Sequence, residues 1–262
     1  MTTPATEAIH ATAIVDSTAQ VHETARVGAY AIVGPHVTVG EETRIYPHAV
    51  VERDTTVGER CRIHYGAVIG GDPQDLKYEG ESTTCIIGND TVIREYVTVN
   101  RGTRALGRTQ IGDGCLLMAY VHVAHDCQIG DKVILSNAVN VAGHVTIDEQ
   151  AIVGGMTPIH QFVRIGAHAF VGGAARVQKD IPPYVKVAGN PAALYGLNSV
   201  GLERRNFPEN VRNELKRAYR LFFNSKHNIT QAVERARAEL HPYPEVVRFI
   251  TFIAESERGV TV

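Results

Sequence analysis

The chain has 262 residues, which is enough for one large or two modest domains. Its formal net charge of −2 argues against a general electrostatic attraction to nucleic acid or to an anionic membrane surface. No segment approaches the roughly 20 apolar residues of a membrane-spanning helix, and residues 1–10 contain neither a basic region nor an apolar signal core. We therefore expect a cytoplasmic protein with no membrane span and no nucleic-acid partner.

Aliphatic residues recur at every sixth position in three runs, over residues 9–69, 87–99 and 111–177. Neither the helical period of 3.6 nor the strand period of 2 explains this spacing. A small residue often lies two positions before the aliphatic one, as Ala25 does before Val27, and a glycine often follows it. Such hexapeptides are the signature of a parallel β-helix, in which three of them form one triangular coil. We expect the glycines to relieve the backbone at the corners.

The cysteines fit this pattern, because all four occupy the small-residue position: Cys61, Cys85, Cys115 and Cys127. None of them shows the spacing of a zinc site or of a disulfide framework. We expect four buried thiols.

The repeat is interrupted at residues 71–84 and again at 103–108. Loops inserted into a solenoid are commonly either functional or simply tolerated. The first insertion is rich in polar side chains, among them Asp75 and Lys77. We expect this first loop to be functional.

Beyond residue 181 the apolar period becomes that of a helix. Pro208 suits the start of one helix, Asn228 with Gln231 resembles a capping box before a second, and Pro244 suits the start of a third. We predict two domains, a parallel β-helix over 1–190 and a helical domain over 191–262. The helical domain would cover the strand edges of the last coil.

One group of polar residues stands out from the otherwise scattered histidines, among which we count His168 as incidental. Residues 18 apart stack in a coil of three hexapeptides, so His125, Gly143 and Gln161 are predicted to form one column beside Asp126 and His144. Such a patch offers a base, a carboxylate and a backbone N–H, which acyl transfer to a hydroxyl needs. Two other interpretations stay open here: a merely solvated corner, or a metal site of the kind found in hexapeptide-fold carbonic anhydrases.

Five segments carry a family resemblance over the whole chain: QDLKY (74–78), HVAHDC (122–127), AGH (142–144), GGMTPIHQF (154–162) and GLERRNF (201–207). With them the chain resembles the bacterial acyl-[acyl-carrier-protein]:UDP-N-acetylglucosamine O-acyltransferases of lipid A biosynthesis. The resemblance implies a left-handed coil, which period six alone does not. It also implies a homotrimer that transfers a 3-hydroxyacyl chain from an acyl carrier protein thioester to the 3-hydroxyl of UDP-N-acetylglucosamine. We expect no cofactor and no metal.

The resemblance also implies roles for individual residues. His125 would be the general base, Asp126 would support it, and the N–H of Gly143 would bind the oxyanion. Six residues would contact the sugar, the phosphates or the acyl chain: Asp75, Lys77, His122, His144, His160 and Gln161. The nucleotide end would be held by Asn198, Arg204 and Arg205. Gly173 would set the length of the acyl chain.

Other functions remain to be weighed against this one. A related N-acyltransferase acting on a UDP-amino sugar has an additional N-terminal uridine-binding domain, for which a repeat that starts at Ile9 leaves no room. A metal-dependent hydratase would need bound zinc, and a non-catalytic scaffold would not need the column of His125. Pro191 and Val200 depart from the family pattern and leave the nucleotide contacts less defined.

Overall fold

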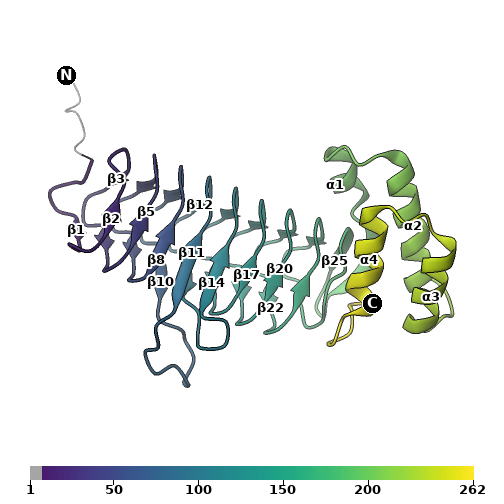
Figure 1. The fold of residues 1–262 in the computed structure, drawn as a ribbon. Coiled ribbons are helices and arrows are strands. Elements are labelled where there is room, and N and C mark those ends of the chain that lie inside the picture. The colour runs from purple at the N-terminus through teal and green to yellow at the C-terminus, as the bar shows by residue number, and fades with distance from the viewer. Residues whose placement is uncertain (1–7) are drawn as a thin grey trace.

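The computed structural model describes residues 8–262, so the first seven residues of the predicted β-helix lie outside the described part of the chain. The chain forms a triangular prism of stacked coils, and helices stand against the C-terminal end of this prism (Figure 1).

Three parallel sheets form the faces of the prism, and each coil contributes one short strand to each of them. The first sheet contains β1 (Ile14–Val15), β4 (Ile32–Val33), β7 (Val50–Val51), β10 (Val68–Gly71), β13 (Thr98–Asn100), β16 (His122–Val123), β19 (Asn140–Val141) and β22 (Pro158–Ile159). The second sheet contains β2 (Gln20–Val21), β5 (Thr38–Val39), β8 (Thr55–Val57), β11 (Thr84–Ile87), β14 (Arg108–Ile111), β17 (Gln128–Ile129), β20 (Thr146–Ile147) and β23 (Arg164–Ile165).

The third sheet is the longest, because it continues beyond the repeat. It contains β3 (Arg26–Val27), β6 (Arg44–Ile45), β9 (Arg62–Ile63), β12 (Val92–Ile93), β15 (Leu116–Leu117), β18 (Ile134–Leu135), β21 (Ile152–Val153), β24 (Phe170–Val171), β25 (Val185–Ala188) and β26 (Ala193–Leu197). The last of these strands, β26, pairs antiparallel with β25, whereas the pairs before it are parallel.

The strand register confirms the predicted stacking of residues one coil apart. His122 pairs with Asn140, and Asn140 pairs with Pro158. The two insertions lengthen the spacing between them, since Val68 pairs with Thr98 and Thr98 pairs with His122. The strands before and after each insertion therefore still pair in register, and each insertion leaves the prism as a loop.

In the two-residue strands the second residue points into the prism and forms the core. Ile63, Leu117 and Val153 are fully buried, and all four cysteines are buried free thiols, as predicted. Burying such a side chain contributes about 1.5–3 kcal/mol. Because the core is a single stack of aliphatic layers, it has no need of the bulky aromatic rings that this sequence largely lacks.

The glycines that follow the aliphatic residues have a different role from the one predicted. Positive φ angles occur two residues later and mostly on other residue types, such as Tyr30 at 57° and Asp126 at 59°. A Cβ on Gly130 would lie 2.7 Å from the backbone nitrogen of Glu149, which belongs to the next coil. These glycines are needed because adjacent coils approach each other closely at that position.

Helices follow the hairpin of β25 and β26: α1 (Ser199–Arg204), α2 (Glu209–Phe223), α3 (Ile229–Glu239) and α4 (Pro244–Ala254). The predicted capping box of α3 is present, with Asn228 and Gln231 each bonded to the other's backbone N–H. Pro244 opens α4 as expected. The helices begin later than the predicted position 191, since residues 193–197 extend the third sheet and cover its edge. Among residues 8–262, no helix is both long and apolar enough to cross a membrane.

Candidate active site

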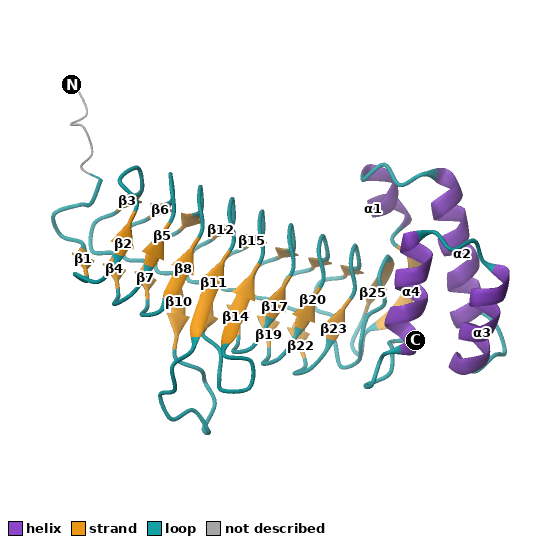
Figure 2. Ribbon diagram, in the orientation of Figure 1, coloured by secondary structure: helices purple, strands orange, loops and turns teal. Residues whose placement is uncertain are grey.

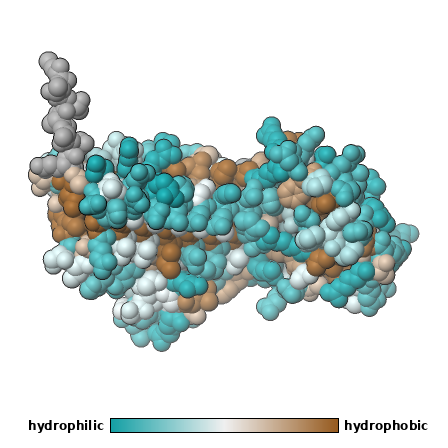
Figure 3. All heavy atoms as spheres, turned by 45° about the horizontal axis from the view of Figure 1, so that its top comes forward, coloured by the Kyte–Doolittle hydropathy of each residue, from teal (hydrophilic) through white to brown (hydrophobic). Residues whose placement is uncertain are grey.

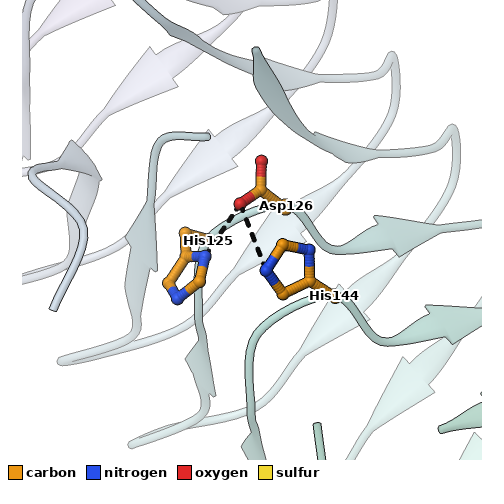
Figure 4. A group of neighbouring side chains, drawn as sticks. All are labelled: His125, Asp126 and His144. Atoms are coloured by element: carbon orange, nitrogen blue, oxygen red, sulfur yellow. Dashed lines mark hydrogen bonds and ion pairs between the residues drawn. The ribbon is translucent and has the colours of Figure 1, made fainter. Parts of the chain in front are cut away.

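The predicted polar group lies at the corner between the first and second sheets, where β16, β19 and β22 turn into the strands that follow them. The structure brings together these seven residues from three stacked coils: His122, His125, Asp126, Gly143, His144, His160 and Gln161. Figure 4 shows the side chains of His125 and His144 converging on the carboxylate of Asp126.

The Asp126 carboxylate fixes the orientation of the His125 ring. Nδ1 of His125 lies 2.8 Å from Oδ2 of Asp126, and the side chain of His125 is 14% exposed. Because an ionised carboxylate only accepts hydrogen bonds, Nδ1 carries the hydrogen, and Nε2 of the neutral ring keeps its lone pair. The lone pair of Nε2 is thus available to a substrate hydroxyl, as a general base requires.

Asp126 remains charged although its side chain is fully buried. Burial opposes the charge, but hydrogen bonds from Thr103 and His125 outweigh this effect and lower the pKa of the carboxyl below its ordinary value. The N–H and the hydroxyl of Thr103 donate to the carboxylate at 3.0 and 2.6 Å. The N–H of Leu106 donates to it at 3.2 Å.

Gly143 lies directly beneath the ring of His125. A Cβ at this position would be 2.7 Å from the imidazole, so only glycine lets the base sit here. At the equivalent corner position of another coil, the N–H of Asp113 donates to the carboxylate of Asp131 at 2.8 Å. The backbone N–H of this corner residue can therefore donate to an anionic group beside the next coil. For Gly143, the residue of the next coil is Gln161.

The remaining histidines surround the dyad of His125 and Asp126. Nδ1 of His122 lies 2.8 Å from the hydroxyl of Thr98, and burial followed by the neighbouring His125 lowers the pKa of His122. His144 stacks on Phe162 with 4.6 Å between the ring centroids.

His160 is exposed at the edge of the same corner. Its Nδ1 lies 3.0 Å from the backbone carbonyl oxygen of Gln161, to which it donates. The guanidinium of Arg258 lies 3.2 Å from the same Nδ1, so the C-terminal segment reaches this corner.

Atoms of His125, Asp126 and His144 lie within 4.8 Å of one another, close enough to hold a metal ion. The chemistry of the donors argues against this use. Oδ2 of Asp126 already accepts hydrogen bonds from Thr103 and His125, and Nδ1 of His125 would have to give up its hydrogen before it could bind a metal.

The first insertion, between β10 and β11, leaves the prism as a loop (Figure 2), and both Asp75 and Lys77 belong to it. The carboxylate of Asp75 accepts the N–H of Lys77 at 3.0 Å, which shapes the tip of the loop. The base of this loop is held by Arg101, which is 1% exposed and donates to the carbonyl oxygens of Arg53 and Gly70 at 2.6 and 2.7 Å.

Sequence reasoning missed Arg101 and Thr103. The available signal was the polar run Asn100–Thr103, which follows directly after the buried Val99 at the end of a strand. Buried polar residues in such a place need partners, and these lie in neighbouring coils: the carbonyl oxygen of Gly70 for Arg101 and the carboxylate of Asp126 for Thr103.

The nucleotide-binding residues predicted from the resemblance lie at the C-terminal end of the prism. Asn198 caps α1 by accepting the N–H of Gly201 at 3.1 Å, and its amide donates to the carbonyl oxygen of His168 at 3.0 Å. Arg205 donates to the side chain of Gln150 at 2.6 Å, whereas Arg204 is exposed.

Gly173 lies at a different corner, between the third and first sheets. A Cβ on Gly173 would lie 3.3 Å from the carbonyl oxygen of Gly155, and one on Gly155 would lie 3.0 Å from that of Asn137. Asn137, Gly155 and Gly173 therefore form a column along the coils. Within one chain this column and the dyad of His125 and Asp126 lie at different corners of the prism.

Family models match three parts of the chain. Residues 180–261 match the second domain of UDP-N-acetylglucosamine O-acyltransferase, residues 108–143 match the bacterial transferase hexapeptide, and residues 9–107 match the GMPPB C-terminal domain.

Individual relatives extend this likeness to nearly the whole chain. The acyl-[acyl-carrier-protein]–UDP-N-acetylglucosamine O-acyltransferase of Thermodesulfovibrio yellowstonii is 44% identical over 253 residues, covering 96% of this chain and 98% of that protein. The enzyme of the same name from Aquifex aeolicus is 62% identical over 193 residues, covering 73% of this chain and 74% of that protein.

Solved structures agree with the relatives. The structure of LpxA from Acinetobacter baumannii is 41% identical, covers 97% of this chain and 100% of that chain, and superposes with a TM-score of 0.94. The UDP-N-acetylglucosamine acyltransferase of Arabidopsis is 33% identical, with a TM-score of 0.86 over 97% of this chain and 100% of that chain. The fold is thus the predicted left-handed parallel β-helix with C-terminal helices, and the protein belongs to the acyl-[acyl-carrier-protein]–UDP-N-acetylglucosamine O-acyltransferase family of acyltransferases.

Proposed function

We propose that this protein transfers a 3-hydroxyacyl chain from an acyl carrier protein thioester to the 3-hydroxyl of UDP-N-acetylglucosamine, in the cytoplasm, as the first step of lipid A biosynthesis. The observation that carries the proposal is the dyad of His125 and Asp126 beside Gly143, in a chain of this family. A dyad of this geometry supplies a positioned base next to a backbone N–H.

In the proposed mechanism, Nε2 of His125 takes the proton from the sugar hydroxyl while the hydroxyl oxygen attacks the thioester carbonyl carbon. The tetrahedral intermediate carries its negative charge on the former carbonyl oxygen, which accepts the N–H of Gly143. Collapse of the intermediate breaks the carbon–sulfur bond, and the imidazolium of His125 returns its proton to the departing thiol. The buried Asp126 stabilises the imidazolium in between.

The roles of the other residues are part of the same proposal. His122, His144, His160 and Gln161 line the dyad and contact the sugar, the phosphates or the acyl chain. Asp75, Lys77, Asn198, Arg204, Arg205 and Gly173 complete the site from other parts of the molecule. No cofactor and no metal is needed, because the thioester is already an activated acyl donor.

We include a homotrimer in the proposal, because Gly173 lies at a different corner from the dyad and Asn198, Arg204 and Arg205 lie at the C-terminal end of the prism. Apolar side chains are visible among the polar ones on the surface of the prism (Figure 3). At the corner between the third and first sheets, Tyr30, Tyr120 and Met156 are 59%, 62% and 72% exposed. Exposed apolar groups gathered along one edge favour burial against another subunit.

The test is product analysis by mass spectrometry after incubation with UDP-N-acetylglucosamine and a panel of acyl carrier protein thioesters. We expect one O-acylated product from the wild type. The variant His125→Ala should fold normally and lose about 10²–10⁴-fold in rate. A variant that kept more than about half of the wild-type rate would rule out His125 as the base.

A further inference from the structure

The second insertion, residues 103–108, holds the Asp126 carboxylate in place. Its backbone and side chains provide three donors to that carboxylate: the N–H of Thr103, the hydroxyl of Thr103 and the N–H of Leu106. The ring of His125 provides the fourth. A buried carboxylate with four donors has a fixed orientation, because any rotation would leave donors without an acceptor.

The hydroxyl of Thr103 is itself oriented. Its oxygen accepts the N–H of Ala105 at 3.2 Å, so its hydrogen is directed at Oδ2 of Asp126, the oxygen that also bonds His125. The loop is closed by the N–H of Gly107, which donates to the carbonyl oxygen of Thr103 at 2.7 Å. At its start, a Cβ on Gly102 would lie 2.2 Å from the backbone nitrogen of Arg108, so the turn requires glycine.

The same loop is tied to the first insertion. The N–H of Arg104 donates to the carboxylate of Glu81 at 3.1 Å, and its guanidinium donates to Glu79 at 3.1 Å. Asn100 donates to the carbonyl oxygen of Asp72 at 2.9 Å. The segment from Asn100 to Arg104 therefore connects the loop of the first insertion with the carboxylate behind the dyad.

We propose that Thr103 is a positioning residue for the acyl transfer, which holds the Asp126 carboxylate so that the ring of His125 presents Nε2 to the sugar hydroxyl. This inference rests on the proposed function. Thr103 does not touch substrate in this proposal, and it acts only through Asp126. The second insertion then has a catalytic purpose of its own, in addition to supporting the first.

The test compares Thr103→Val, which keeps the shape but removes the donor, with Thr103→Ser, which keeps the donor. We expect Thr103→Val to lower kcat by roughly 10- to 100-fold at nearly unchanged KM for UDP-N-acetylglucosamine, because misplacing a catalytic group by about 1 Å has effects of this size. Thr103→Ser should restore most of the rate, which a general loss of packing would not allow.

The matched control is Thr91→Val. Thr91 is also buried, and its hydroxyl donates to the carbonyl oxygen of Gly112 at 2.8 Å, at the corner between the second and third sheets. This variant should lower the melting temperature while kcat stays near that of the wild type. Equal losses of kcat in Thr91→Val and Thr103→Val would mean that Thr103 has only a structural role.

A double-mutant cycle separates this inference from the proposed function. In an Asp126→Ala background, Thr103→Val should change kcat by less than about twofold, because the carboxylate that Thr103 holds is gone. Full additivity, or a wild-type kcat in Thr103→Val beside an inactive His125→Ala, would overturn the role of Thr103 and leave the dyad intact. An inactive wild type, or an active His125→Ala, would instead refute the proposed function.

Discussion

His168 occupies the last coil of the prism, at the junction with the helices. On sequence alone it counts among the scattered, incidental histidines, but the residue is only 8% exposed. Its ring stacks on Tyr184 and meets the edge of Phe207, which follows α1. Burial, followed by the nearby charge of Arg205, lowers the pKa of His168 to about 4.

This lowered pKa predicts a specific loss of stability in acid. The unfolded chain takes up a proton near the ordinary histidine pKa of about 6.5, whereas folded His168 does so only near pH 4. The free energy of unfolding should therefore fall as the pH drops from about 6.5 to 4, by on the order of 2 kcal/mol once solvent screening is considered. The variant His168→Phe should show a flatter pH dependence of the melting temperature.

Phenylalanine is a suitable replacement, because Phe162 adopts the same positive φ, 63°, at the equivalent position of the preceding corner. The control is His36→Phe, at an exposed histidine with the same backbone conformation. Its melting curve should follow that of the wild type at every pH. If His168→Phe also did so, the acid sensitivity would have to come from other groups.

Residues inside the repeat could be placed from the sequence, because the length of a coil, 18 residues, determines which residues of adjacent coils lie next to each other. That is why the column of His125, Gly143 and Gln161 was predicted correctly. Thr103 and Arg101 could not be placed in this way. They belong to segments that follow no period, and their partners, Asp126 and the carbonyl oxygen of Gly70, are contacts that only the folded loops create.

At the scale of the elements, a coil tolerates side chains at some corner positions and excludes them at others. A Cβ on Gly154 would lie 2.4 Å from the backbone nitrogen of Gly173, so Gly154 must remain glycine. A Cβ on Gly173 itself would meet the carbonyl oxygen of Gly155 at 3.3 Å, which needs only a small shift. A larger side chain at Gly173 is therefore compatible with the fold and projects along the outside of the coils.

The variant Gly173→Met tests whether the acyl chain runs along this column. We expect its preference among acyl carrier protein thioesters of graded length to move to shorter chains, because the new side chain would occupy the path of the acyl chain along the column. Each excluded methylene is worth about 1–3 kcal/mol in discrimination. The melting temperature and the KM for UDP-N-acetylglucosamine serve as controls and should stay near the wild-type values. An unchanged length profile in a folded variant would place the acyl chain elsewhere.

Elements outside the repeat were predicted less completely. The starts of α2, α3 and α4 could be read from Pro208, Asn228 and Pro244, since capping and first-turn preferences are local. The strand β26 and the helix α1 were missed. The strand forms only because β25 offers an unpaired edge, and α1 is a single short helix that depends on the side chain of Asn198 as its cap.

For the molecule as a whole, the sequence could predict that helices cover the end of the prism but not how they are attached. Part of the attachment is polar. Arg248 of α4 bonds the carboxylates of Asp148 and Glu149 at 3.1 and 2.8 Å, and the ring of Phe252 packs under the guanidinium of Arg164 at 4.5 Å. These pairs join residues 88 to 100 positions apart in the sequence, so no local sequence pattern predicts them.

The carboxylates that Arg248 joins respond to it differently. Burial raises the pKa of Asp148 in spite of the nearby arginine, while the hydrogen bond from Arg248 lowers the pKa of Glu149. Without Arg248, both carboxylates would stay partly buried beside each other with no cation between them. Removing it should therefore weaken the junction by more than the loss of an ordinary surface ion pair.

We predict that Arg248→Ala lowers the free energy of unfolding by about 1–2 kcal/mol, because the carboxylates of Asp148 and Glu149 lose their shared partner while still partly shielded from water. In a chain of this size the melting temperature should drop by roughly 3–6 °C. The matched control is Arg235→Ala, which removes the exposed pair of Arg235 with Glu239 within α3 and should cost about 0.3–0.5 kcal/mol. Limited proteolysis locates the effect: cleavage in Arg248→Ala should begin in the helices while the prism stays intact. Equal, small losses of stability in both variants would show that apolar packing alone holds the helices on the prism.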